Sequence, residues 1–225
     1  MSSNPLTTPA AHISFLGART TLLFAGLATA LAGFLDAVGY AQLDHLYVSF
    51  MSGNSTHLGM TLAVGEWGQM IHAGYIIGIF VLGSFVGTVI FDAARKPLIA
   101  LLVGEAVLCS IAIGLAIRGF PTAALTLTAL MMGMQNVMHQ NISGTDAGKG
   151  FITGSLFGLG QSLAHALRKP GEFAHAFVHG TSWLSFIFGV ICGTLCFTHW
   201  GVVSSLVIAF FGLILMILIS LKLTI

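Results

Sequence analysis

Charged side chains are scarce in this sequence. Lys, Arg, Asp and Glu together make up 7% of the 225 residues, whereas hydrophobic residues make up 56%. A soluble domain of this length carries far more surface charge, so the composition excludes an ordinary soluble protein. The mean hydropathy of +0.96 indicates an integral membrane protein instead.

The chain also lacks a cluster of basic residues, and it contains few cysteines. Its formal net charge is +1, which predicts no nucleic-acid partner. Cys109, Cys192 and Cys196 lie in apolar segments, where cysteine behaves as a small hydrophobic residue more often than as a ligand. There is no paired-cysteine metal motif, phosphate-binding loop or nucleophile elbow. We therefore predict no metal, no cofactor and no enzymatic activity.

Eight hydrophobic segments follow an N-terminal tail. The tail, residues 1–18, is rich in Ser, Thr, Pro and Ala and lacks periodicity, so we expect it to be mobile. A membrane span needs about 20 apolar residues, so residues 19–225 form one transmembrane domain with room for six to eight passes. The segments are 20–41, 46–65, 69–91, 97–117, 121–138, 151–167, 176–197 and 201–221.

The sequence contains a weak internal repeat. The stretch 50–59 (FMSGNSTHLG) is answered by 151–160 (FITGSLFGLG), with the phenylalanine and two glycines at identical spacing. Upstream, 33–36 (GFLD) is answered by 133–136 (GMQN). Matched polar breaks in apolar surroundings are typical of a binding site or pore at the interface of a duplicated membrane protein. We place repeat one at about 20–118 and repeat two at about 119–222.

The basic residues indicate a topology. If all eight segments cross the membrane, five basic residues lie on the cytoplasmic side and three outside. If 46–65 and 151–167 enter and return on the same side, seven lie inside and only Arg118 outside, which fits the positive-inside rule better. Each repeat then has three spans plus one broken or re-entrant helix, and the second repeat is inverted. This predicts an all-α polytopic protein with a cytoplasmic N-terminus; the alternative is seven or eight full spans.

The third segment of each repeat carries a close-packing motif. These motifs are Gly83-x-x-x-Gly87 and Gly189-x-x-x-Gly193. Small residues four apart let helix backbones approach, because helix association in lipid depends on packing. Ordinary packing inside the chain explains them, and they also allow a homo-oligomer formed through these faces.

Three stretches carry a resemblance to a known family. The runs 33–40 (GFLDAVGY) and 48–54 (VSFMSGN), with Thr153-Gly154 later, resemble the YoaK-type family of small bacterial membrane proteins, a domain of unknown function. That family usually has Thr-Gly-Asn where this chain has Ser-Gly-Asn at 52–54, a change that keeps the hydroxyl. The resemblance implies a bacterial cytoplasmic (inner) membrane protein of about six spans with no established activity.

Two acidic residues lie within apolar segments. A carboxylate in or near lipid is costly unless it is paired, protonated or facing water, so Asp36 and Glu105 are functional candidates. The alternatives are that Asp36 is a helix-end residue bonded to the next loop and that Glu105 is a structural acid bonded to a neighbouring helix. Asn136, the counterpart of Asp36, cannot ionise.

The polar residues around the two breaks complete the predicted solute or ion pathway. His57 and His139 each follow a polar cluster and could relay protons, although packing or interfacial placement also explains them. The full set is Asp36, Ser52, Gly53, Asn54, Ser55, His57, Glu105, Gln135, Asn136, His139, Thr153, Gly154 and Ser155.

Three functions remain open. The first is a small-solute or ion transporter or channel, in which irregular backbone at 52–56 and its counterpart meet at the middle of the membrane between the two repeats. The second is a non-transporting scaffold or accessory protein, whose polar breaks only lock helices together. The third, an intramembrane enzyme, lacks a recognisable catalytic set. The expected partners are the lipid bilayer and an unknown small solute or ion.

Overall fold

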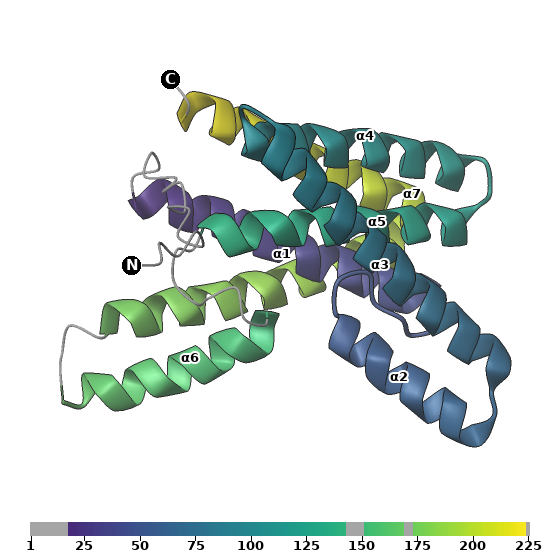
Figure 1. The fold of residues 1–225 in the computed structure, drawn as a ribbon, viewed down its shortest axis with the longest axis horizontal. Helices are drawn as coiled ribbons and strands as arrows, with labels where there is room; N and C mark the ends of the chain where they lie inside the picture. Colours follow the sequence, from purple (N-terminus) through teal and green to yellow (C-terminus); the bar gives the residue numbers. More distant parts are fainter. Residues whose placement is uncertain (1–17, 143–150, 169–172, 224–225) are drawn as a thin grey trace, which may run out of the picture.

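The computed structural model describes residues 18–142, 151–168 and 173–223, and the regular secondary structure within them is all helix (Figure 1). The predicted all-α class is therefore confirmed, while all but the last residue of the predicted N-terminal tail lies outside the described residues. The helices are α1 (Ala18–Gln42), α2 (Met51–Val64), α3 (Trp67–Ala93), α4 (Pro97–Ile117), α5 (Pro121–Ile142), α6 (Phe151–Ala166) and α7 (Phe173–Leu223).

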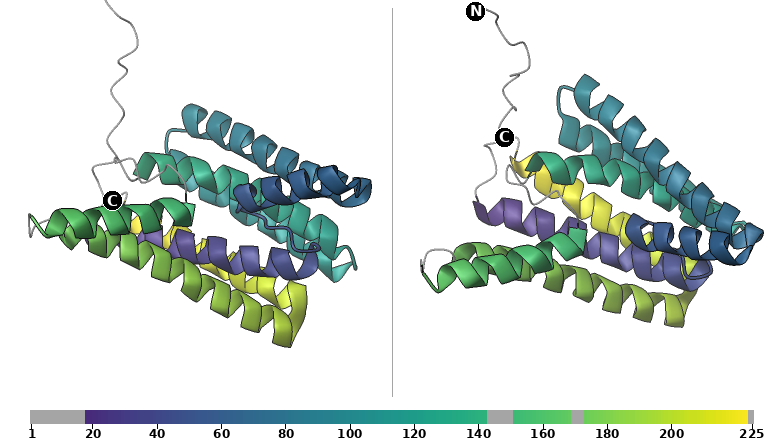
Figure 2. Two further views of the ribbon diagram at one scale, coloured as in Figure 1. Left: turned by 90° about the horizontal axis from the view of Figure 1, so that it is seen from below. Right: turned by 60° about the horizontal axis from the view of Figure 1, so that its bottom comes forward.

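Helix α7 is two helices joined at a glycine. Gly201 has a φ of 73° and a ψ of −174°, which no α-helix contains. A positive φ is accessible to glycine at little cost because it has no Cβ. Figure 2 shows that the chain doubles back at this point, where lime gives way to yellow. The boundary that the sequence places just before residue 201 is thus confirmed.

Four of the described helices are long and apolar enough to cross a membrane: α1, α3, α4 and α7. The 49-residue apolar stretch of α7 rises about 73 Å, roughly twice the 30 Å hydrocarbon core, so each of its two halves is long enough for one pass. Helix α5 has 22 residues and is more polar. Helices α2 and α6, with 14 and 16 residues, rise only about 21 and 24 Å and are too short to cross.

Two groups of helix ends lie at opposite ends of the molecule. Figure 1 shows the start of α1, the α3–α4 turn, the end of α6, the start of α7 and the end of α7 at the left. The α2–α3 and α4–α5 turns lie at the right. Helix α2 packs along α3, and α6 packs along the first half of α7. The two short helices do not pack against each other. The expectation that the two polar segments meet is therefore wrong, because each is held by the long helix that follows it.

Glycines set the closest helix contacts. A Cβ added at Gly83 of α3 would collide with the carbonyl oxygen of Leu130 in α5, and one at Gly189 of α7 would collide with that of Ala30 in α1. The faces that carry Gly83 and Gly189 are thus occupied by helices of the same chain.

Candidate functional site

The loop 43–50 folds back onto the helix that precedes it. The Oδ1 atom of Asp36 accepts hydrogen bonds from the backbone N–H groups of Val48 at 2.9 Å and Ser49 at 2.7 Å. The hydroxyl of Ser49 donates to Oδ2 at 2.6 Å. Asp36 is buried, so its carboxyl group is used entirely to hold this loop. The structure thus shows the arrangement of a helix-end residue bonded to the next loop.

Asn54 holds the same loop from the other side. Its Oδ1 accepts a hydrogen bond from the N–H of Tyr47 at 2.9 Å, and its Nδ2 donates to the carbonyl of Tyr47 at 2.8 Å. Asn54 is fully buried. The loop itself needs left-handed backbone at Asp44 and His45, whose φ angles are 50° and 67°. Two buried side chains therefore stabilise a backbone path that is unfavourable on its own.

Asn54→Ala should lower the free energy of unfolding by about 2 kcal/mol, because it leaves the N–H and carbonyl of Tyr47 without their partner in a buried site. The measurement is thermal unfolding in detergent micelles. The control is Thr56→Ala, which removes an exposed hydroxyl bonded only to the Ser52 carbonyl of its own helix and should change stability little. Equal losses of unfolding free energy in both variants would contradict the stabilising role assigned to the Asn54 hydrogen bonds.

The backbone at 52–56 is regular, which corrects the sequence prediction. These residues form the first turns of α2, and the hydroxyls of Ser55 and Thr56 donate to the carbonyls of Met51 and Ser52. The irregular backbone lies immediately upstream, at 43–50. The N–H groups of residues 47–49 are bonded by Asn54 and Asp36, and this long-range bonding is not visible in the local sequence.

Gly53 is explained by packing. It is helical, and a Cβ at this position would lie 2.6 Å from Cδ1 of Phe50 and 3.0 Å from Cε2 of Tyr47. Its counterpart Gly154 is helical too. Neither is among the described residues with positive φ. Glycine at position 53 therefore makes room for two aromatic rings.

An aromatic hollow of about 380 Å³ lies at the end of α1 and the start of α2. The ring of Tyr47 lies 5.1 Å from that of Tyr40 and 5.2 Å from that of Phe50. The lining residues are Tyr40, His45, Tyr47, Phe50, Ser52, Gly53, Thr56, His57 and Met60.

This hollow joins three predicted residues with several that sequence reasoning missed. Ser52, Gly53 and His57 were predicted, whereas Tyr40, His45 and Tyr47 were not. The sequence signal that could have found them is the group of aromatic residues between the first two apolar segments, at positions 40, 47 and 50. Phenol, hydroxyl and imidazole groups can donate hydrogen bonds, so the lining suits a small polar solute.

The predicted residues of the second half lie elsewhere. Gln135 is fully buried in α5, and Asn136 donates to the carbonyl of Met132 in its own helix at 2.8 Å. Thr153 and Gly154 begin α6, where the Ser155 hydroxyl lies 3.3 Å from that of Ser182 in α7. His139 belongs to α5, but its side chain lies outside the described residues.

Glu105 is isolated in the middle of the protein. It has no exposed surface, and within the described part of the chain neither carboxyl oxygen has a hydrogen-bond partner. A structural acid bonded to a neighbouring helix is therefore not what the described residues show. The two buried acids differ sharply: the Asp36 carboxyl group accepts three hydrogen bonds, whereas that of Glu105 accepts none from the described residues.

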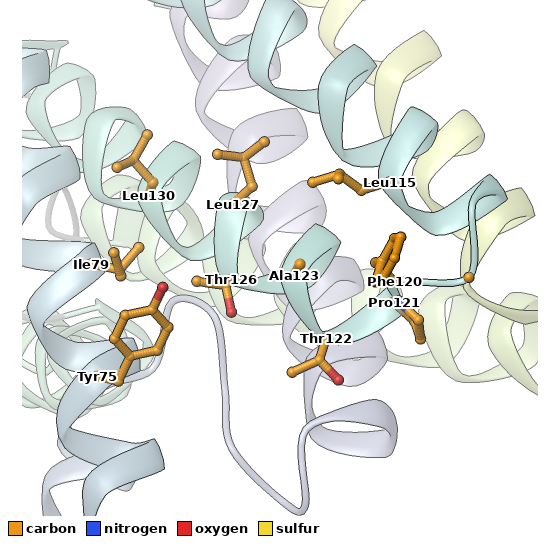
Figure 3. Close-up of a pocket in the computed structure, with 11 residues that line it drawn as sticks. Tyr75, Ile79, Leu115, Phe120, Pro121, Thr122, Ala123, Thr126, Leu127 and Leu130 are labelled. Carbon is orange, nitrogen blue, oxygen red and sulfur yellow. The ribbon is translucent and has the colours of Figure 1, made fainter.

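A larger groove of about 600 Å³ lies between α3, the end of α4 and the start of α5 (Figure 3). Most of its lining is apolar, with Ile79, Leu115 and Leu127 prominent, and the hydroxyls of Tyr75 and Thr122 are among its few polar groups. None of the predicted site residues lines it. Its chemistry favours an apolar occupant over a polar solute.

Comparisons with known proteins identify the family. Residues 24–219 match the family described as Protein of unknown function (DUF1275). The chain belongs to this family. It is 30% identical over 154 residues to the UPF0700 transmembrane protein RA0705 of Rhizobium meliloti (strain 1021). That alignment covers 68% of this chain and 63% of the relative, so the chain spans less than two thirds of the relative's length. No solved structure matches.

The family match confirms the resemblance read from the sequence, and the chain is a multi-pass transmembrane protein of unknown function. The match covers both acidic residues and both short helices.

Proposed function

We propose that this chain is a small-solute or ion transporter or channel, built from two inverted repeats with the boundaries given above. The observation that carries the proposal is a set of duplicated contacts. Each contact in one half has an equivalent contact in the other half. The residue numbers of equivalent positions differ by a constant amount within each segment. The pairs are Gly33 with Phe186 and Gly133 with Phe80; Gly83 with Leu130 and Gly189 with Ala30; Gly87 with Met134 and Gly193 with Phe34; Gly74 with Leu58 and Gly180 with Leu159.

The arrangement of the ends supports inversion. Each repeat contributes three long helices and one short one, and α2 and α6 end at opposite ends of the molecule (Figure 1). The end that carries the start of α1, the α3–α4 turn, the end of α6 and the end of α7 holds all the basic residues of the described part except Arg118. By the positive-inside rule this end is cytoplasmic, which orients the chain in the bacterial cytoplasmic membrane.

The short helices place polar groups at membrane depth. Ser182, the partner of Ser155, lies about 14 Å along α7 from its start, so α6 begins beside the middle of that pass. A Cβ added at Gly74 would lie 3.8 Å from Cδ1 of Leu58, and the antiparallel α2–α3 pair likewise puts the start of α2 beside the middle of α3. Short helices that start at mid-depth from opposite faces are a known plan for transporters. The aromatic hollow offers space for a solute beside the start of one of these short helices, α2.

A second function, a scaffold, is favoured by a specific observation. Asp36 and Asn54 direct all their described hydrogen bonds within the fold and present none to a solute. In a scaffold the polar breaks would only lock helices together. Transport and scaffolding differ in whether the hollow is needed for anything beyond stability.

Cysteine labelling tests the topology. In a background with the three native cysteines replaced by alanine, Ala94→Cys and Leu167→Cys should react with a membrane-impermeant maleimide only from the cytoplasmic side. Phe120→Cys, at the α4–α5 turn, should react only from outside. Labelling of Ala94→Cys and Leu167→Cys from opposite sides would refute the inverted arrangement and restore eight crossings.

Flux measurements test transport. The purified protein is reconstituted in liposomes, and uptake of a panel of ions and metabolites is followed. Ser52→Phe fills the aromatic hollow and should reduce uptake at least about tenfold, which corresponds to about 1.4 kcal/mol on the limiting step. Thr122→Phe, an equally exposed hydroxyl residue in the apolar groove, is the matched control. No uptake of any solute, with no solute-dependent thermal stabilisation, would favour the scaffold.

A further inference from the structure

The carboxyl group of Glu105 lies at mid-depth in the protein. Glu105 is about 12 Å from the start of α4 at Pro97 and about 18 Å from its end at Ile117. Helix α4 is one of the helices able to cross a membrane. The residue is therefore far from both lipid–water interfaces and is shielded from them by protein.

The walls around Glu105 are small and apolar. Helix α4 packs against α5 and α7. A Cβ added at Gly104 would lie 3.1 Å from the end of the Met134 side chain in α5, and the Cys109 thiol donates to the carbonyl of Leu206 in α7 at 3.5 Å. The buried residues on the same helix include Leu101 and Ala112. Apart from the Cys109 thiol, the side chains that these contacts join are apolar.

No described charge compensates this acid. Cys109, one turn further along α4, is the titratable group beside it. From α3, α5 and α7, no Asp, Glu, Lys, Arg or His of the described part acts on the carboxyl group, and no donor reaches either oxygen. The second half of α7, which occupies the equivalent place in the other repeat, contains no acidic residue. Glu105 is therefore an unmatched acid in a symmetric framework.

An ionised carboxylate without a partner is strongly disfavoured in such a site, because burial removes its hydration and nothing replaces it. A metal cation would need several further ligands. The described residues hold no group of three His, Cys, Asp or Glu that could supply them. A proton needs only one carboxyl oxygen. The geometry thus selects the proton over a metal cation as the species that neutralises Glu105.

We propose that Glu105 is a proton-binding site at the middle of the membrane, and that proton movement through it is coupled to solute movement. The coupling rests on the transport function proposed above, whereas the proton site does not. In each cycle the carboxylate takes up one proton from one side, becomes a neutral carboxylic acid, and releases that proton to the other side. No other group changes its bonding.

Carbodiimide labelling tests the proton site independently of transport. Dicyclohexylcarbodiimide adds to a protonated carboxyl group in an apolar site, and its stable adduct is located by peptide mass spectrometry. In detergent-purified protein at neutral pH, Glu105 should be labelled and the exposed Glu66 and Asp92 should not. Labelling should fall by about tenfold per pH unit once the pH exceeds the point at which the acid ionises. Labelling that is absent from folded protein, or that does not change with pH, would overturn the proposal.

Glu105→Gln tests the coupling. Glutamine has nearly the shape of the neutral acid and cannot exchange a proton, so the variant should fold and lose proton-linked flux, measured with a pH-sensitive dye inside the liposomes. Unchanged proton-linked flux in this variant would overturn the inference while leaving transport standing. Normal pH-dependent labelling of Glu105 without flux of any tested solute would keep the proton site and overturn the transport function instead.

Discussion

Replacing Asp36 by alanine should lower the free energy of unfolding by about 3–5 kcal/mol. The carboxyl group accepts three hydrogen bonds, two from backbone N–H groups and one from the Ser49 hydroxyl, all in a buried site. Alanine leaves those donors without a partner in protein that excludes water. Thermal unfolding in detergent measures the loss, and labelling of a cysteine at Tyr47 reports whether the loop 43–50 has opened.

Asp36→Asn separates a structural role from a role in the pathway. The amide oxygen still accepts the N–H groups of Val48 and Ser49, and the Ser49 hydroxyl can rotate to accept from the amide nitrogen. We expect this variant to fold with a loss of about 1 kcal/mol and to keep its flux. Loss of flux at unchanged stability would contradict this and place Asp36 in the ion pathway. Asn136→Ala is the matched control in the other repeat, because Asn136 bonds only to its own helix among the described contacts.

The helices were predictable from the sequence because apolar runs of span length and their glycine spacing are local features. All eight segments contain helix, although 46–65 begins with the loop before α2, and the reversal at Gly201 follows the boundary between two of them. The placement of the break before α2 was not predictable. It depends on left-handed backbone at Asp44 and His45, which Asp36 and Asn54 stabilise from outside the loop.

The two candidate acids show which feature of the site could not be predicted from the sequence, namely the hydrogen-bonding environment of each carboxyl group. Composition and position put Asp36 and Glu105 in one class, since both are acids in apolar segments. Only packing separates them: the loop 43–50 returns to Asp36, while the faces of α5 and α7 that meet α4 bring no donor to Glu105. The expected meeting of the short helices failed for a related reason. The turn at Gly65, with a φ of 76°, pairs α2 with α3 directly and keeps it away from α6.

Gly189→Ala should destabilise the protein by about 3 kcal/mol or more, because the added methyl group would overlap the backbone carbonyl of Ala30 in α1, and backbone cannot rotate away as a side chain can. Gly83→Ala should cost a similar amount, since its methyl group would meet the carbonyl of Leu130 in the same way. The measurement is thermal unfolding in detergent for each single variant.

The controls are expected to change stability in the opposite direction. At Gly78 and Gly114 no atom lies within 4 Å of an added Cβ, so alanine should gain up to about 1 kcal/mol from its higher helix propensity. A difference in sign between the two pairs would show that contact, and not propensity, decides the outcome. The comparison of Gly189 with Gly83 also tests whether the two repeats are equivalent. If the two halves are equivalent, neither glycine can tolerate an added methyl group, since Gly83 and Gly189 lie over equivalent carbonyls, those of Leu130 and Ala30. Sensitivity at only one of them would mean that the duplicated contacts do not bear equal weight, and the inverted-repeat framework would lose its main support.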